Sequence, residues 1–422
     1  MAGEPLLALF EFSHFGHRPK DLKILIEAWR RRACGGELAL VVTPLFAEAH
    51  PDVLAFASGT AGAPVRVVLT SNEEADKLQS TQMSKAIDVR DFFDVRLSDD
   101  DWSRQHWALF NKYAAELKPR RSLLMELDAF LLPIAMGLNN GNAFSGIYFR
   151  PSFHYRPLAG HEESRAEKVR KLHEKFLLAR ALKHPGLQTV FCLDPTFVAQ
   201  HEAGQGPEVV FLPDPVRLSG GATPTVEERR LKERIGIEIG RKGLLFFGAL
   251  DDRKGTWQLL EALGRLPEDI CRRICLLVIG TVPENQQARL QSRIAALTKG
   301  KPLQILARCE FVPEEAMYAY FHATDLVLAP YQRHIGMSNI ALWAAVFQKP
   351  LLTQSYGLLG ELTRTHRLGL AVDTTNPTAI ADAIRILVES DPETVCDRER
   401  MSAFAESHAA DRFADTILDR LL

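Results

Sequence analysis

Residues 246–263, FFGALDDRKGTWQLLEAL, run from an apolar segment through a glycine and a charged tetrad into an amphipathic segment. This pattern predicts a β-strand that ends at Gly248 and a helix that begins near Thr256. In open α/β sheets, ligands bind at the carboxyl ends of strands, where helix N-termini favour anions. Lys254, directly before Gly255, would supply a compact positive charge for a phosphate oxygen. The stretch therefore indicates a phosphate site, although a solvated turn would carry the same charges.

The rest of the chain repeats this alternation of short apolar and longer amphipathic segments, which is typical of a doubly wound parallel sheet. Predicted strands begin at Leu6, Leu38, Val65, Ser122, Ser145 and Thr189, and later ones lie in GLLFFG, CLLVIG, LQILARCEFV, DLVLAP and PLLTQ. Residues 211–228 are rich in Pro, Gly and Thr and indicate a linker. We therefore expect an α/β protein with an N-terminal domain over 1–220, a C-terminal domain over 221–400 and a terminal helix over 401–422.

Composition excludes some classes of protein. The 422 residues carry 51 Lys and Arg against 53 Asp and Glu, a net charge of -2, without the basic excess of nucleic-acid binders. The six cysteines include no C-x-x-C pair, which favours reduced thiols in a cytoplasmic protein. The opening MAGEPLLALFEF lacks the basic start of a signal peptide, and no apolar run is long enough to span a bilayer.

Two further loops suit an anion. HIGMSN, residues 334–339, lies between a predicted strand and the helix IALWAAVF, where Ser338 or Asn339 would cap the helix. SYGLLGEL, residues 355–362, follows the next strand. Backbone amides at such helix starts can bind phosphate, although an ordinary capped turn has the same sequence features.

The order of these segments resembles the C-terminal donor domain of GT-B glycosyltransferases of the retaining, family-four type. The resemblance covers nearly all of residues 240–390. It begins at G-x-L-x-x-x-K-G and continues through VIGTVPENQQARLQ, FVPEEAMYAYFHATDLVLAPY, the glycine loop, KPLL, GLLGE and LGLAVDTTNPTAIADAI. It implies two Rossmann-like domains facing across a cleft, with the C-terminal helix returning to the N-terminal domain. It also implies a nucleotide-diphosphate sugar as donor, transfer with retention, and neither a metal nor another cofactor.

Donor-side residues carry over unevenly. Lys254 matches the lysine that contacts the donor pyrophosphate, but Ala249 stands where an arginine usually follows the strand-ending glycine, so Arg253 is expected to substitute. The paired glutamates of the family would fall at Ile335 and Trp343, so both are absent. The remaining matches lie in the two later loops: Gly336, Met337, Ser338, Asn339 and Glu361.

The resemblance is thinner in the N-terminal half. Gly16 matches a loop that approaches the donor phosphate, with His14, His17 and Arg18 beside it. His154, in FSGIYFRPSFHYRP, matches the acceptor-side histidine, and with Lys254 it completes the expected catalytic pair. A structural histidine between two aromatic residues is the alternative. Glu126 and Asp128 follow another strand end, where acceptor binding and helix capping are both open.

Two further patterns each allow a functional and an ordinary structural interpretation. SDDDW, from Ser98, contains D-x-D, but acids in the first turn of a helix are ordinary dipole partners, so no metal site is expected. Two basic amphipathic stretches, residues 18–32 and 165–184, would suit peripheral contact with a membrane or simply form solvated faces.

The expected function is therefore transfer of a sugar to an unidentified glycan, lipid or small-molecule acceptor. A catalytically degenerate GT-B scaffold and a nucleotide-sugar epimerase are the alternatives. The nucleotide base, the sugar and the oligomeric state stay open.

Overall fold

The computed structural model describes residues 6–14, 18–59, 62–83, 100–138, 141–149, 151, 165–201, 206–218, 225–334 and 336–422. The chain forms two compact units. It passes from the first to the second between Pro215 and Val216 and returns to the first between Ala409 and Ala410. Sequence analysis placed these two boundaries at 220/221 and 400/401.

The first unit is built on a seven-stranded sheet of order β3-β2-β1-β4-β5-β6-β7, in which every described pairing is parallel. Strands β1 to β3 form one half of the sheet in order, and the chain then returns to the other side of β1 to add β4 to β7. The strand order therefore reverses between β1 and β4, as in doubly wound folds. The strands are β1 (Leu7–Glu11), β2 (Leu38–Val42), β3 (Val65–Leu69), β4 (Arg121–Leu124), β5 (Phe144–Tyr148), β6 (Leu187–Cys192) and β7 (Glu208–Phe211).

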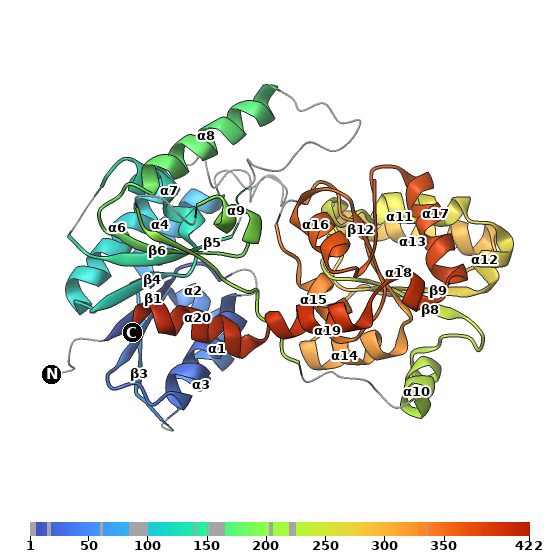
Figure 1. Ribbon diagram of the computed structural model, residues 1–422, viewed down its shortest axis with the longest axis horizontal. Helices are drawn as coiled ribbons and strands as arrows, with labels where there is room; N and C mark the ends of the chain where they lie inside the picture. The colour runs from blue at the N-terminus through green and yellow to red at the C-terminus, as the bar shows by residue number, and fades with distance from the viewer. Residues whose placement is uncertain are drawn as a thin grey trace. The chain divides into compact units, whose positions relative to one another are not determined.

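Helices cover both faces of this sheet (Figure 1), because successive strand side chains point to opposite faces and both sets are apolar. One face packs against α6, α7 and α8, and the other against α1, α3 and α20. The helices are α1 (Arg18–Arg31), α2 (Pro44–Ala49), α3 (Pro51–Ala57), α4 (Asn72–Met83), α6 (Asp100–Leu117), η1 (Leu127–Phe130), α7 (Leu131–Ala135), α8 (Arg165–Ala181), α9 (Pro195–Ala199) and α20 (Ala410–Leu421).

The second unit has a six-stranded parallel sheet of order β10-β9-β8-β11-β12-β13, with its reversal between β8 and β11. Its strands are β8 (Lys242–Phe247), β9 (Ile274–Ile279), β10 (Gln304–Arg308), β11 (Leu326–Ala329), β12 (Leu351–Gln354) and β13 (Gly369–Val372). Neighbouring residues of β8 illustrate the two faces, because Leu244 and Leu245 belong to different apolar clusters.

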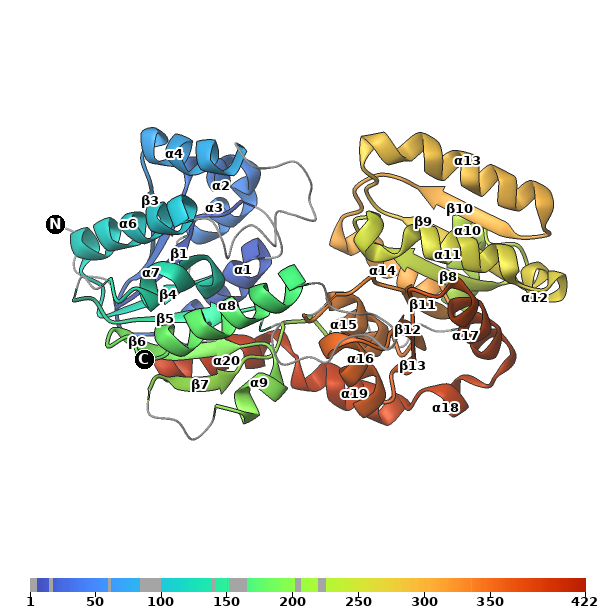
Figure 2. The same cartoon turned by 90° about the horizontal axis from the view of Figure 1, so that it is seen from above.

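One of these clusters includes α14, α15 and α19, and the other includes α11, α13 and α17 (Figure 2). The helices of this unit are α10 (Thr225–Ile235), η2 (Asp252–Lys254), α11 (Thr256–Arg265), α12 (Glu268–Arg272), α13 (Glu284–Gly300), α14 (Glu314–Ala323), α15 (Asn339–Val346), α16 (Gly357–Thr365), α17 (Pro377–Glu389), α18 (Pro392–Val395) and α19 (Arg398–Ser407).

The terminal segment, expected as one helix over 401–422, is two helices. The break occurs at His408, whose carbonyl accepts a hydrogen bond from the amide of Val216 (2.8 Å) instead of continuing the helical ladder. After the break, α20 packs on the first sheet. Arg31, the last residue of α1, and Arg32, which follows it, form ion pairs with acidic residues of α20. None of the helices in the described parts of the chain combines the length and apolarity needed to cross a membrane.

Candidate functional site

The loop after β8 brings Lys254 back over the end of its strand. Asp251 caps the short helix η2 by accepting a hydrogen bond from the Lys254 amide (3.1 Å). Gly255 follows with φ 78°, and a Cβ there would lie 2.0 Å from the carbonyl oxygen of Pro330. Gly248 has φ 124°, and a Cβ there would lie 3.3 Å from Lys254 Nζ. Glycine at both positions therefore allows the close approach of this loop to the strand end and to the loop after β11.

Tyr331 joins the loops that follow β8 and β11. Lys254 Nζ donates a hydrogen bond to Tyr331 Oη and lies 4.1 Å from the ring centroid. The same hydroxyl is 2.9 Å from Ser338 Oγ, and the backbone carbonyl of Tyr331 accepts from Thr374 Oγ1 (2.6 Å). Because β8 and β11 flank the reversal of the sheet, these residues meet where doubly wound folds bind ligands.

Lys254 differs from its neighbour Arg253 in how its charge is balanced. The Arg253 guanidinium lies 3.6 Å from the carboxylate of Asp251. Among the described residues, the ammonium of Lys254 pairs with no carboxylate, and its contacts are the hydroxyl and ring of Tyr331. A positive charge that is held in place without an acidic partner favours an anionic ligand.

The start of α15 also offers polar groups to a ligand. Ser338 occupies the N-cap position as expected, but its side chain forms no capping hydrogen bond because the hydroxyl is engaged with Tyr331. The first amides of α15 are therefore not capped by a side chain. Asn339 Oδ1 is buried and has no hydrogen-bond partner within the described parts of the chain.

Gln354, at the end of β12, fixes the turn that leads to α15. Its side-chain oxygen accepts from the amide of His334 (3.0 Å), while its nitrogen donates to the carbonyls of His334 and Tyr356. The His334 ring donates from Nε2 to the carbonyl of Met337 (3.0 Å). Gly336 and Met337 thus lie in a turn whose backbone is held by a fully buried amide.

Glu361 lies in α16, which follows β12. Its side chain is half exposed and pairs with Arg364 (2.9 Å), with a long contact to Thr365 Oγ1 (3.5 Å). Its contacts among the described residues are therefore confined to its own helix. None of these contacts is with the loops that hold Lys254 and Ser338.

Of the two positions at which the family glutamates are expected to be absent, Trp343 is a described residue and Ile335 is not. Trp343 is 5% exposed and lies in the core, with ring centroids 5.4 Å from Tyr318 and 6.2 Å from Phe347. An indole packed among aromatic rings offers no acceptor to a ribose. Ile335 lies outside the described residues.

Three residues expected from the N-terminal half, Gly16, His17 and His154, also lie outside the described residues. His14 is described and partly buried. Its carbonyl accepts from His50 Nε2 (2.8 Å). Burial, and then repulsion from His50, lowers the pKa of His14, so its ring is neutral near pH 7.

Arg18, expected beside the Gly16 loop, is a buried structural cation. It pairs with Glu11 and with Glu126, both at 2.7 Å. Glu126 is therefore engaged in an ion pair with α1. Asp128, for which capping was one expectation, instead accepts from the amide of Phe149 (2.9 Å) and holds the end of β5.

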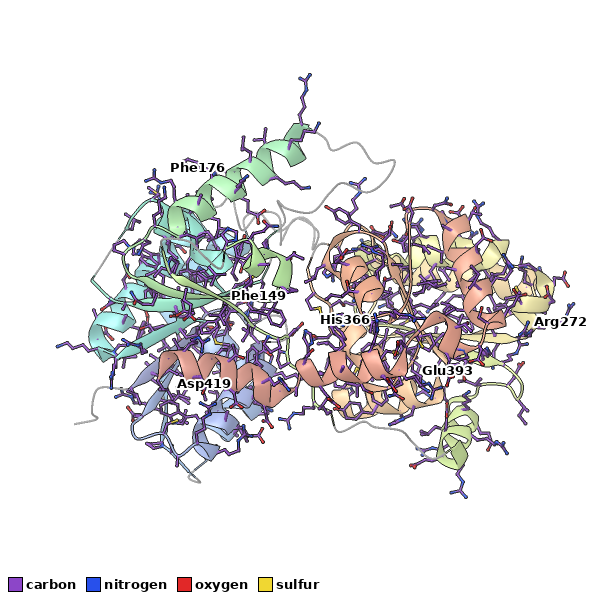
Figure 3. The ribbon with its side chains drawn as sticks, viewed as in Figure 1. Phe149, Phe176, Arg272, His366, Glu393 and Asp419 are labelled. Atoms are coloured by element: carbon purple, nitrogen blue, oxygen red, sulfur yellow. The ribbon has the colours of Figure 1, made fainter. Side chains whose placement is uncertain are left out.

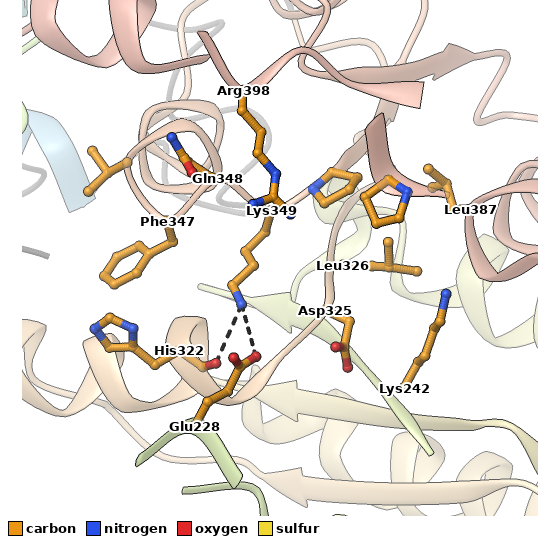
Figure 4. A pocket seen from close by; sticks show the side chains of 13 residues that line it. Glu228, Lys242, His322, Asp325, Leu326, Phe347, Gln348, Lys349, Leu387 and Arg398 are labelled. Atoms are coloured by element: carbon orange, nitrogen blue, oxygen red, sulfur yellow. Dashed lines mark hydrogen bonds and ion pairs between the residues drawn. The ribbon is translucent and has the colours of Figure 1, made fainter. Parts of the chain in front are cut away.

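A cavity of about 290 Å³ lies at the amino ends of the strands of the second sheet (Figure 4). Its lining includes Lys242 and Leu326, the first residues of β8 and β11, whereas Lys254 follows the carboxyl end of β8. Within it Lys349 pairs with Glu228 (3.3 Å). This cavity contains none of the site residues expected from the sequence.

The D-x-D stretch shows no metal site in its described part, where Asp101 is exposed in the first turn of α6. Over the residues that the structure describes, no three His, Cys, Asp or Glu side chains gather as they would around a metal ion.

Both the sequence and the fold of this chain resemble those of known proteins. Residues 241–390 match the family Glycosyl transferases group 1, and this range contains Lys254, Tyr331, Ser338 and Glu361. The matched range lies within the second unit. A D-inositol 3-phosphate glycosyltransferase of Corynebacterium diphtheriae is 28% identical over 194 residues, which are 44% of this chain and 43% of that protein. The match therefore spans less than half the length of that relative.

Solved structures match almost the whole chain. HepE of Anabaena, in complex with UDP, aligns with TM-score 0.65 and 12% identity over 98% of this chain and 99% of that chain. WaaG, a glycosyltransferase involved in lipopolysaccharide biosynthesis, aligns with TM-score 0.63 and 13% identity over 98% of each. At such low identity these matches establish the fold, which is GT-B, as the sequence predicted.

Sequence reasoning missed Tyr331 and Gln354. Tyr331 lies two residues beyond the end of β11 at Ala329, and a polar aromatic residue at the carboxyl end of a strand was the available signal. Gln354 is the last residue of an apolar strand, and a buried amide there requires local partners. No signal in the sequence identified those partners as the backbone of His334 and Tyr356.

Proposed function

We propose that this protein is a glycosyltransferase that moves a sugar from a nucleotide-diphosphate sugar to an acceptor, with retention and without a metal ion. The observation that carries the proposal is the ammonium of Lys254, held at the reversal of the donor-domain sheet without a carboxylate partner. The group 1 glycosyl transferase domain supports it, as does the UDP bound to the structurally similar HepE.

Each donor-side group has a chemical role in this proposal. Lys254, assisted by Arg253, stabilises the negative charge that develops on the leaving diphosphate. Backbone amides of Gly336, Met337 and Ser338, together with the uncapped first amides of α15, add hydrogen bonds to phosphate oxygens. Asn339 Oδ1, a buried acceptor, takes a hydroxyl hydrogen of the donor.

Three groups complete the proposed site. Glu361 exchanges its pairing with Arg364 for a donor hydroxyl. The backbone at Gly16 approaches the donor phosphate, and His154 orients the transferred sugar. The last two are proposed from the family resemblance, because neither is a described residue.

The acceptor is unidentified, and the inositol phosphate named for the bacterial relatives is a reasonable first compound in a screen. We also propose that the protein acts in the cytoplasm. Its six cysteines are all free thiols, which suits a reducing compartment.

Thermal unfolding with UDP, GDP or ADP tests the donor site directly. A ligand at about 100 times its dissociation constant stabilises the folded state by roughly 2.7 kcal/mol. We expect one nucleotide to raise the unfolding midpoint of the wild type and of Lys299→Ala, an exposed lysine on α13, but not of Lys254→Ala. If no nucleotide raises the midpoint at millimolar concentration, the proposal fails.

Transfer itself needs a second measurement. With the sugar nucleotide of the stabilising base, release of the nucleoside diphosphate should depend on an added acceptor and should be lost in Lys254→Ala. Conversion of the sugar nucleotide without an acceptor would identify an epimerase instead. Nucleotide binding with neither reaction would identify a degenerate GT-B scaffold.

A further inference from the structure

Helix α8, in the first unit, is fixed to its domain by one well-defined face. Leu177, Leu178 and Ala181 are buried in the core. Glu174 is also buried and accepts a hydrogen bond from the hydroxyl of Tyr148 (2.8 Å). These contacts determine which side of α8 points outward.

The outward face carries an apolar stripe. Val169, Leu172 and Phe176 are 66%, 68% and 58% exposed, and their spacings of three and four residues place them on one side of the helix. Figure 3 labels Phe176 on this helix. Single exposed apolar residues are common on protein surfaces, as at Ile239, but three large ones in one helical row are not. Nothing in the described parts of the chain covers this row.

Basic residues border the stripe on both sides. Helical geometry places Lys168 and Lys175, both exposed, along one edge. Arg180 lies along the other edge, with its guanidinium carbon 5.9 Å from the Phe176 ring centroid. The helix contains six Lys or Arg residues against two Glu, and Glu174 points into the core. The border is therefore cationic.

We propose that the outward face of α8 docks on an anionic bilayer surface. Val169, Leu172 and Phe176 enter the boundary between headgroups and acyl chains, while Lys168 and Lys175 lie at the level of the lipid phosphates. An exposed apolar row between two basic edges matches this environment in both polarity and charge. Docking at α8 is independent of the donor chemistry in the second unit.

The test is co-sedimentation of the full-length protein with vesicles of phosphatidylglycerol mixed with phosphatidylcholine, and with phosphatidylcholine alone. We expect binding to the anionic vesicles that weakens as salt is raised. Leu172→Glu and Phe176→Glu should each lower the partition coefficient by about tenfold or more, because the apolar contact is lost and an anion is added. Lys175→Ala should lower it by about fivefold, the contribution of one charge near such a surface.

Ile239→Glu is the control, because Ile239 is 95% exposed but lies in the second unit, away from α8, and the nearby Arg241 is paired with Glu238. Circular dichroism and the unfolding midpoint should be unchanged in all variants, since the substituted side chains are exposed. Equal binding to both kinds of vesicle, no binding, or undiminished binding of Phe176→Glu would each overturn the proposal. So would a dimer in size-exclusion chromatography that Phe176→Glu dissociates, because a second copy of the chain would then be the occupant.

Discussion

The ammonium nitrogen of Lys254 lies 4.1 Å from the centre of the Tyr331 ring and donates a hydrogen bond to the hydroxyl of the same residue. These two contacts hold a long, flexible side chain without neutralising it, because a phenol ring and hydroxyl carry no formal charge. The positive charge is thus in place before a ligand arrives, which is the condition for electrostatic stabilisation without reorganisation.

Lys254→Gln should abolish the preference for a diphosphate over the bare nucleoside. Glutamine can still hydrogen-bond Tyr331 but carries no charge. The affinity for the nucleoside diphosphate should fall about ten- to hundredfold, the contribution of a charged hydrogen bond. Isothermal titration with the nucleoside and its diphosphate measures both affinities, and an equal fall in the two would show that Lys254 acts on something other than phosphate.

Tyr331→Phe should have a smaller effect on the same measurement. The ring remains beneath the ammonium, but the hydroxyl that links Lys254 to Ser338 is lost. We expect diphosphate affinity to fall by only about fivefold, because Lys254 keeps its charge and loses only a contact that positions it. Ser338→Ala removes the other end of the link, and the double variant should be no weaker than the worse single variant. Additive losses would contradict a shared role.

Gly255→Ala should be more disruptive than a glycine-to-alanine substitution in an ordinary turn. The added Cβ would lie 2.0 Å from the carbonyl oxygen of Pro330, so the loops after β8 and β11 must separate. Gly240 is a matched control, because its φ of 87° is similar to the 78° of Gly255 but open space surrounds its Cβ position.

Gly240→Ala should therefore cost only the backbone strain of about 1–2 kcal/mol. Gly255→Ala should lower the unfolding midpoint further and also remove nucleotide stabilisation. Similar midpoints for the two variants would mean that the loop relaxes without penalty.

The fold was predictable because its strands are apolar runs bounded by polar turns. Eleven predicted strands overlap β1 to β6 and β8 to β12. In the first unit only β7 was not predicted. It is a four-residue edge strand (Glu208–Phe211), and its short apolar segment adjoins the predicted linker that begins at residue 211. The break in the terminal helix was not predictable, because the hydrogen bond between His408 and Val216 joins residues far apart in the chain.

The site was predictable only where backbone chemistry leaves a mark in the sequence. A strand end that approaches another backbone is indicated by the glycines at 248 and 255 and the lysine between them. Tyr331 and Gln354 leave no such mark, because their roles depend on which loops the sheet order brings together. The same limit applies to Ser338, which was expected to cap α15 but instead contacts Tyr331.

Asp214 gives the first unit a pH-dependent stability. Its side chain is buried between two prolines, and Oδ1 has no partner among the described residues. Burial raises the pKa of Asp214 to about 7, with Lys20 opposing the shift. Burial, and then the neighbouring Asp214, also raises the pKa of Asp21 well above its usual range.

Asp214→Asn should therefore stabilise the protein at alkaline pH. Between about pH 4 and pH 7 the folded state holds a proton on Asp214 that the unfolded state has lost, so stability falls as the pH rises through this window. The loss is complete above pH 7, where it amounts to about 4 kcal/mol at most. Asparagine is never ionised, so the variant should match the wild type near pH 4 and exceed its unfolding midpoint at pH 8. Asp382→Asn, at an exposed position on α17, should leave the pH profile unchanged. If the unfolding midpoints of the wild type and of Asp214→Asn changed in the same way between pH 5 and pH 8, Asp214 would already be ionised in the folded protein at pH 5.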